Sequence, residues 1–237
     1  MDIEFKPNDP SSIYASTYTF GNDAAVYRST DSGDNFLLVT TIPDSKRINI
    51  EVTPSNPNRV ELLVANAQFG PQGLWRSSDA GTNFNQYYDG DCSINLLSNI
   101  YDGSSCGGQG YYDLAFTINP SNANEIWVGG INTWASIDNG LTFTPKTMWT
   151  GNSNLNPLSF PVVHADKHDF KFHPLQPNTL FDCNDGGLYK STDGGATWTD
   201  LSDGLGISQI YRIGVSQNTA NSVICGLQDN GTKEIIG

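Results

Sequence analysis

The three histidines of the chain, His164, His168 and His173, lie within a single short stretch that also contains Asp166. On an extended strand His164, Asp166 and His168 would point to one face, because alternate side chains of a strand share a face. Imidazole and carboxylate groups on one face can hold a divalent metal ion or hydrogen-bond sugar hydroxyls. The alternative is structural: these side chains brace the entry to a strand.

The long segment between Tyr87 and Tyr112 is the second place where binding chemistry is expected, because loops of this length are often functional. Tyrosine and tryptophan rings can stack on sugar rings, or they can fill gaps in the packing. The candidate ligand-binding residues are therefore His164, Asp166, His168, Asp169, Tyr111, Tyr112, Asp113 and Trp149. These residues require no cofactor. If they bind one, we expect a divalent cation held by His164, Asp166 and His168.

Two of the four cysteines, Cys92 and Cys106, flank a loop rich in Gly, Ser and Asn. This spacing is compatible with a local disulfide in an oxidising compartment. No pair of cysteines has the CxxC spacing that is typical of structural zinc sites. The other two, Cys183 and Cys225, fall in equivalent strands of successive repeats, where contact and separate burial are both open.

The elements that position these residues are repeats. The pattern S-x-D-x-G-x-x-[FW] occurs four times, and an internal repeat is the first feature to seek in a chain of this kind. Its Asp, Gly and aromatic positions are Asp31, Gly33, Phe36, Asp79, Gly81, Phe84, Asp138, Gly140, Phe143, Asp193, Gly195 and Trp198.

A second element precedes each copy of this pattern. Short apolar runs such as Ile3/Phe5 and Phe170/Phe172 have the period and composition of strands. In the pattern itself, Asp accepts hydrogen bonds from nearby backbone N–H groups, Gly tolerates positive φ, and the aromatic residue can fold back onto a core. Each unit therefore predicts four antiparallel strands.

The four copies resemble the Asp-box, or BNR-repeat, β-propellers, a family that includes sialidases, xyloglucanase-type glycoside hydrolases, sortilin-type receptors and secreted bacterial proteins. The resemblance covers nearly the whole chain, and in this family the box is a structural turn remote from the active centre. It implies an all-β propeller of four-stranded antiparallel blades. STDGGATW, residues 191–198, then marks architecture and not chemistry.

The repeats divide the chain into four blades and a part of a fifth. We expect blades over residues 1–46, 47–110, 111–166 and 167–210, with a partial blade over 211–237. Because propellers of this family usually have six or more blades, we expect this to be a segment of a larger one. Its partners would include the remaining blades or further copies of the chain, since an open arc exposes sheet faces and strand edges.

Asn184-Asp185-Gly-Gly and Gln228-Asp229-Asn-Gly occupy corresponding places after the second strand of successive repeats. Turn chemistry alone selects Asp or Asn before Gly at such places. We therefore interpret both stretches as turns and not as sources of catalytic acids.

The charge balance excludes one class of function. The chain of 237 residues has a net charge of −13, with 25 acidic residues against 12 basic ones. A nucleic-acid-binding protein would need a basic stripe.

No apolar run reaches the ~20 residues of a membrane span. We expect an extracellular or cell-surface protein of the bacterial secreted type. The first ten residues lack the basic start and apolar middle of a secretory signal, so an exported protein would have lost its signal or would carry it outside this chain.

Enzyme activity is uncertain from the sequence. A sialidase needs several convergent arginines, but the chain has only five, and Arg28 and Arg76 directly precede their boxes. A xyloglucanase-type hydrolase needs two carboxylates across a cleft, which in that family come from two propellers. The sequence thus predicts a secreted, non-catalytic propeller that binds glycan or an extracellular protein through its loop face. The alternative is a fragment of an extracellular glycoside hydrolase.

Overall fold

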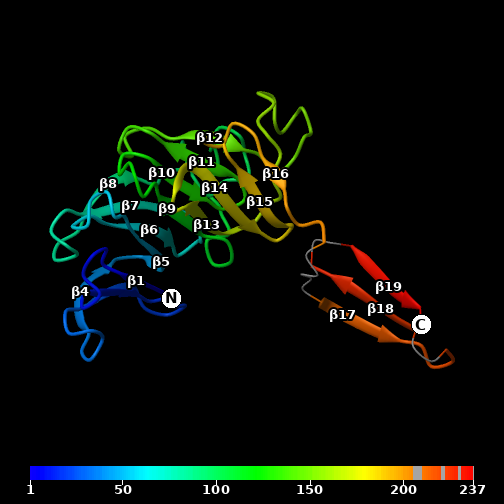
Figure 1. The fold of residues 1–237 in the computed structure, drawn as a ribbon, viewed down its shortest axis with the longest axis horizontal. Helices are drawn as coiled ribbons and strands as arrows, with labels where there is room; N and C mark the ends of the chain where they lie inside the picture. The colour runs from blue at the N-terminus through cyan, green and yellow to red at the C-terminus, as the bar shows by residue number, and fades with distance from the viewer. Residues whose placement is uncertain (205–209, 220–221, 229–230, 237) are drawn as a thin grey trace.

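The fold is built entirely from antiparallel sheets (Figure 1). The computed structural model describes residues 1–204, 210–219, 222–228 and 231–236. These residues form four four-stranded sheets and one of three strands, each a simple meander in chain order. Among them no helix is long and apolar enough to cross a membrane. The predicted all-β architecture of propeller blades is confirmed.

Each sheet arises from one repeat. The strands are β1 Asp2–Phe5, β2 Ile13–Ser16, β3 Ala24–Ser29 and β4 Leu37–Ile42 in the first sheet; β5 Ser45–Val52, β6 Val60–Asn66, β7 Pro71–Ser77 and β8 Asn85–Asp89 in the second; β9 Ala115–Ile118, β10 Ile126–Gly129, β11 Thr133–Ser136 and β12 Thr144–Thr147 in the third; β13 Lys167–His173, β14 Gln176–Asn184, β15 Gly187–Ser191 and β16 Thr199–Asp200 in the fourth; and β17 Ile210–Val215, β18 Ser222–Leu227 and β19 Thr232–Ile236 in the fifth.

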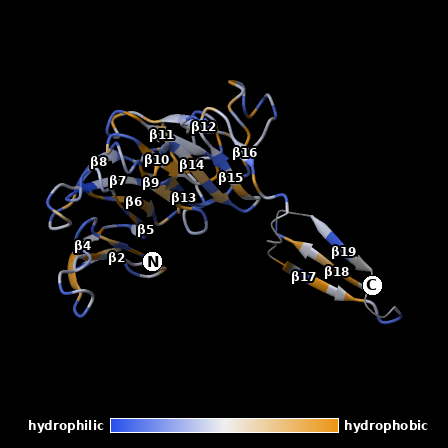
Figure 2. Ribbon diagram, in the orientation of Figure 1, coloured by the Kyte–Doolittle hydropathy of each residue, from blue (hydrophilic) through white to orange (hydrophobic). Residues whose placement is uncertain are grey.

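The hydrophobic core lies between successive sheets. Apolar side chains alternate along β6: Val60, Leu62 and Val64 pack towards the first sheet, and Leu63 and Ala65 pack towards the third. A third cluster joins the third and fourth sheets. Figure 2 shows the hydrophobic residues concentrated on the strands and the hydrophilic ones in the loops. The first four sheets therefore stack face to face as an arc, whereas Figure 1 shows β17–β19 standing apart from them.

The four S-x-D-x-G turns have one hydrogen-bond pattern. In the second sheet the Ser77 hydroxyl donates to Asp79 Oδ1 over 2.7 Å, and the Gly81 N–H donates to Ser77 Oγ over 2.8 Å. Asp79 also accepts bonds from the backbone and side-chain N–H groups of Asn83. The other three turns repeat this pattern, with Asn35, Thr142 and Thr197 at the Asn83 position. The structural role predicted for the box aspartates is thus visible in their geometry.

The box glycines also serve the contact between sheets, which the sequence did not indicate. Gly195 has φ +84°, and a Cβ atom built there would lie 2.2 Å from Cη2 of Trp127 in the preceding sheet. Gly81 has φ +76° and would meet the ring of Tyr14 at 2.5 Å. The Tyr14 hydroxyl in turn donates to the Ala80 carbonyl over 3.0 Å. Only glycine combines this left-handed conformation with such close approach.

The box aromatic residues follow the prediction in three sheets and depart from it in the first. Phe84, Phe143 and Trp198 pack into the clusters shared with the preceding sheet. Phe36 is 41 % exposed, so the expectation that it folds onto a core is wrong. The physical reason is that these aromatic residues pack against the preceding sheet, and among the described residues no sheet packs against this face of β1–β4.

Candidate functional site

The candidate site lies on the loop end of the arc, opposite the box turns. In a four-stranded antiparallel meander, the loop between the second and third strands and the connection from the fourth strand to the next sheet lie at the same end of the strands. The segments 17–23, 67–70, 90–114, 148–166 and 185–186 therefore all belong to one end of the sheets. This end carries the predicted candidates that lie in the two long connections, 90–114 and 148–166.

A hydrogen-bonded triangle forms the centre of the site. Asp185, in the turn between β14 and β15, accepts the Tyr112 hydroxyl at 2.9 Å and 2.8 Å on its two carboxylate oxygens. The His168 Nε2 atom lies 2.7 Å from Asp185 Oδ1. The rings of Tyr112 and His168 meet edge to face, with centroids 4.8 Å apart. The turn interpretation of Asp185 is right but incomplete, because this carboxylate joins the two predicted candidates.

An aromatic row extends from this triangle across the loop end. Its successive ring pairs are Tyr112–Tyr111 at 6.4 Å, Tyr111–Phe69 at 5.1 Å, Phe69–Phe20 at 6.4 Å and Phe20–Tyr18 at 5.0 Å between centroids. We call these five side chains the aromatic row. Phe20 is 78 % exposed and Tyr111 is 48 % exposed. Two large apolar rings are thus presented to solvent on a ridge built from the first three repeats.

Sequence reasoning missed Phe20, Phe69 and Asp185 as site residues. The signal that would have found them is their shared repeat position: each lies in the loop between the second and third strands of its sheet. Aromatic residues in three of these loops or long connections converge only because the sheets are stacked side by side. That convergence is a property of the arc and not of any one repeat.

Arg47 fixes the backbone under the tyrosines. Its Nη1 atom donates to the carbonyl oxygens of Gly110 and Tyr112 over 3.3 Å and 3.1 Å. Arg47 also lines a polar cavity of about 300 Å³ at the inner edge of the arc, together with Asp2, His168, Asp169 and Lys171. The predicted candidate Asp169 lies here, with its carboxylate 3.5 Å from Lys171 Nζ.

Asp113 is a buried acid beneath the row. Its side chain has no exposed surface, and neither carboxyl oxygen has a hydrogen-bond partner of normal geometry among the described residues. Burial, together with the charge of nearby Asp166, raises the pKa of Asp113 to about 8. Asp113 is therefore protonated at neutral pH, and because its side chain is fully enclosed it cannot contact a ligand.

The expectation that His164, Asp166 and His168 share one face of a strand is wrong. The strand β13 begins at Lys167, and Asp166 has φ +61°, a left-handed conformation that breaks the alternation of an extended chain. The His164 ring instead lies against Gly186, where an added Cβ atom would meet its Cγ at 2.4 Å. Within the described ranges, no group of three His, Cys, Asp or Glu side chains is arranged to hold a metal ion.

Trp149 is held separately from the tyrosines with which it was grouped. Its indole N–H donates to the Asn99 carbonyl over 3.2 Å, and its backbone N–H donates to Asn132 Oδ1 over 3.0 Å. The ring is 38 % exposed. A disulfide joins Cys92 and Cys106, a pairing that the sequence left open, and it closes the same long connection that carries Tyr111 and Tyr112. Cys183 and Cys225 are free.

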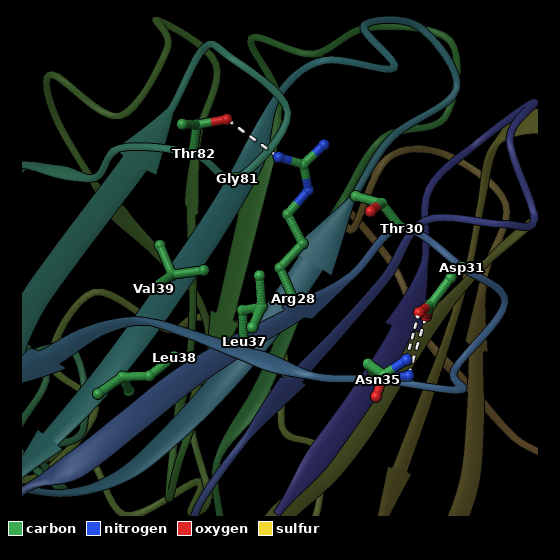
Figure 3. Close-up of a pocket in the computed structure, with 9 residues that line it drawn as sticks. All are labelled: Arg28, Thr30, Asp31, Asn35, Leu37, Leu38, Val39, Gly81 and Thr82. Carbon is green, nitrogen blue, oxygen red and sulfur yellow. Dashed lines mark hydrogen bonds between the residues drawn. The ribbon is translucent and has the colours of Figure 1, made fainter.

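A second cavity lies at the opposite end, beside the first box turn (Figure 3). It measures about 360 Å³ and is lined by Arg28, Leu37, Leu38 and Val39 among others, with Arg28 Nη1 bonded to Thr82 over 3.1 Å. In the second sheet Tyr87 stands at the repeat position of Val39, and its ring lies 4.0 Å beneath the Arg76 guanidinium. The smaller valine leaves this gap, so the cavity has a packing origin.

Comparisons with known proteins show the fold but no family. No family model matches the chain, and no curated protein matches it. The similar crystal structures include an ancestral GH74 enzyme, with 18 % identity and a TM-score of 0.56, and the GH74 enzyme of Niastella koreensis, with 18 % identity and a TM-score of 0.57.

The similar region covers almost all of this chain but a minor part of the hydrolases. It spans 95 % and 98 % of this chain, and 27 % and 34 % of the two GH74 chains. This chain therefore has the β-propeller fold of glycoside hydrolase domains and about a third of their length or less. The narrower assignment to the Asp-box family stays a prediction.

Proposed function

We propose that this chain is a polysaccharide-binding segment of a glycoside-hydrolase-like propeller, and that the sugar chain lies along the aromatic row. The observation that carries this proposal is the exposure of Phe20 and Tyr111 on one ridge, backed by Phe69 and by the Tyr112–Asp185–His168 triangle. Exposed apolar patches of this kind mark interaction sites on soluble proteins. The likeness to GH74 enzymes supports the choice of a carbohydrate as the ligand.

The ligand in this proposal is an uncharged polysaccharide. With a net charge of −13, the protein repels acidic polymers at moderate ionic strength. Beside the row, the His168 side chain is 37 % exposed and its imidazole can hydrogen-bond sugar hydroxyls, whereas Asp185 is 5 % exposed and serves to hold the His168 and Tyr112 side chains in place. The divalent cation expected from the sequence at His164, Asp166 and His168 stays a proposal, and the same experiment with EDTA tests it.

Catalysis by this segment belongs to the alternative function, a hydrolase fragment. Hydrolysis of a glycosidic bond needs two carboxyl groups that reach the bond. Asp113 has a raised pKa, as a general acid needs, but its side chain is enclosed. The Asp169 side chain is 48 % exposed and is paired with Lys171. The arrangement therefore favours binding by this chain over cleavage.

We propose an extracellular location, because the Cys92–Cys106 disulfide persists in oxidising compartments.

Affinity electrophoresis in gels containing xyloglucan, mixed-linkage glucan or an acidic polysaccharide tests this function. We expect retardation by an uncharged polysaccharide, and a roughly tenfold loss of affinity in Phe20→Ala and Tyr111→Ala. Leu175→Ala is the matched control, because Leu175 is 85 % exposed in the β13–β14 turn at the other end of the sheet. Retardation that both row variants retain in full would contradict the proposal, and loss of binding with EDTA would support the cation.

A further inference from the structure

The cavity beside the first box turn has an apolar wall and a charged wall (Figure 3). Leu37, Leu38 and Val39 on β4 form the apolar wall, and Leu37 is 74 % exposed. Arg28 on β3 and Asp31 in the box turn form the charged wall. We call this space of about 360 Å³ the Arg28 cavity. Apolar walls with a few polar groups are typical of sites for small ligands.

The guanidinium group of Arg28 has fewer partners than its equivalent in the second sheet. Arg76 pairs with Glu61 over 2.7 Å and donates to the Asn139 carbonyl over 2.9 Å. In the part of the chain that the structure describes, Arg28 forms no ion pair, and its Nη1 atom donates to Thr82 Oγ1 over 3.1 Å. Arg28 therefore brings to the cavity a positive charge that no neighbouring carboxylate neutralises directly.

The second sheet shows which group fits against such an arginine. Val39 and Tyr87 occupy the same bulge, because each is the unpaired residue near the start of the fourth strand of its sheet. The Tyr87 ring centroid lies 4.0 Å from the Arg76 guanidinium carbon, and the Tyr87 hydroxyl donates to the Glu61 carboxylate. A phenol ring thus has a cation at its face and a carboxylate at its hydroxyl.

The first sheet leaves this ring position open. In the third sheet the bulge residue is Lys146, whose long side chain reaches the Trp127 ring, with Nζ 6.0 Å from its centroid. Val39 is too short to reach so far. The contact with the next box turn is already made from β2, where the Tyr14 ring lies against Gly81. The cavity is therefore a place for a ring that β4 does not supply.

Asp31 offers the carboxylate that such a ring needs. Its Oδ1 atom accepts the Ser29 hydroxyl at 2.7 Å and the Asn35 backbone N–H at 2.9 Å. Its Oδ2 atom accepts one bond among the described residues, from Asn35 Nδ2 at 2.8 Å. Since a carboxylate oxygen can accept two hydrogen bonds, Oδ2 can accept one more. The bonds from Asn35 and Ser29 lower the pKa of Asp31 to about 2, so this group is ionised at neutral pH.

We propose that the Arg28 cavity binds a small uncharged phenol. The ring face lies against the Arg28 guanidinium, the ring edge contacts Leu37 and Val39, and the hydroxyl donates to Asp31 Oδ2. The ligand is uncharged because one cation and one carboxylate already balance each other in the wall. The cavity lies at the end of the sheets opposite the aromatic row, so this inference goes beyond the proposed function and does not depend on it.

A methyl NMR titration with p-cresol, the side-chain analogue of tyrosine, tests this proposal. We expect saturable shifts of the Leu37 and Leu38 methyl signals, with a Kd on the order of 1 mM. The Leu175 methyl signals, from an 85 % exposed residue of the fourth sheet, should stay unchanged. 4-Methylcyclohexanol has the hydroxyl but no π face, and should bind about 2- to 30-fold more weakly. Equal binding of the two compounds would overturn the proposal, as would a titration without saturable shifts.

Variants of the cavity wall separate the ring from the space that it fills. Val39→Tyr should abolish p-cresol binding, because the introduced ring occupies the cavity from within. Val39→Thr is the matched control, which keeps the side-chain volume and should keep the Kd within about twofold. Arg28→Met keeps the side-chain length and should weaken p-cresol by about the same factor as the loss of the π face. Binding that survives Val39→Tyr, or that is unchanged in Arg28→Met, would contradict the assignment.

Three controls complete this experiment. Urea unfolding shows that each variant is folded, and the comparison of p-cresol with 4-methylcyclohexanol on the natural chain needs no variant. A capped Gly-Tyr-Gly peptide that binds more tightly than p-cresol would overturn the assignment to a small phenol and indicate a protein segment instead. Polysaccharide retardation of Val39→Tyr should equal that of the natural chain, so it reports separately on the aromatic row.

Discussion

At the scale of single residues, Asp113 shows how the loop end is supported. Asp113 directly follows Tyr112 in the sequence, and its carboxyl group is buried near Asp166. Burial and this neighbouring charge raise the pKa of Asp113 to about 8, above the ~3.9 of an unfolded aspartate. The folded state therefore binds a proton that the unfolded state releases between these two values. Stability from this group is full below about pH 4 and is lost as the pH rises towards 8.

We expect Asp113→Asn to remove this pH dependence. The neutral amide cannot ionise, so the variant should gain stability relative to the natural chain as the pH rises from 5 to 8, by on the order of a few kcal/mol. Urea unfolding at several pH values measures it, with the exposed Asp203→Asn as the control. A natural chain and a variant with parallel pH profiles would contradict the assignment.

Residue types alone indicated part of this candidate site. The histidine-rich stretch and the Tyr111-Tyr112-Asp113 run could be chosen from the sequence, because their side-chain types alone indicate binding chemistry. The partners of these residues could not. Asp185 follows a strand in a stretch that any turn would select, and Phe20 lies in a loop of a different repeat. The left-handed backbone at Asp166, which separates it from the face of His168, also leaves no signal in its spacing.

At the scale of the element, the box turn has two roles that one sequence pattern combines. Its aspartate closes the turn, and this role follows from local chemistry alone. Its glycine lies against a ring of the sheet before it, and this role depends on a residue far away in the chain: Trp127 and Gly195 are 68 residues apart. The sequence could therefore predict the turn but not the junction. Phe36 fails as a core residue for the same reason.

The pair Gly194 and Gly195 separates these two roles. Both have positive φ, +68° and +84°, but an added Cβ atom meets nothing within 4 Å at Gly194 and meets Trp127 at 2.2 Å at Gly195. Gly194→Ala should cost about 1 kcal/mol from backbone strain alone. Gly195→Ala should cost about 1–3 kcal/mol more, because the Trp127 ring must move. Urea unfolding of the two variants measures the difference, and equal losses would show that the ring adapts without cost.

At the scale of the whole molecule, repetition multiplies one electrostatic feature. The hydrogen bonds within the four turns lower the pKa of every box aspartate, to about 2 for Asp31, Asp138 and Asp193 and lower still for Asp79. A lowered pKa means that stability is present above about pH 3.9 and is lost as the pH falls towards 2. Buried acids act in the opposite direction, since burial raises the pKa of Glu4 to about 7 and that of Glu51 well above its usual range.

These two opposing pH dependences predict that the free energy of unfolding is greatest at about pH 4–5 and not at neutral pH. Below this window the four turns take up protons and lose their bonds. Above it Glu4 and Asp113 ionise, and the net charge grows towards −13, which adds repulsion. The free energy of unfolding, measured in urea from pH 2.5 to 8, should therefore pass through a maximum in mild acid. Asp79→Asn should flatten only the acid limb, and Asp113→Asn only the limb above pH 5. A single rise to a maximum at pH 7 would show instead that the paired carboxylates outweigh the buried ones over the whole range.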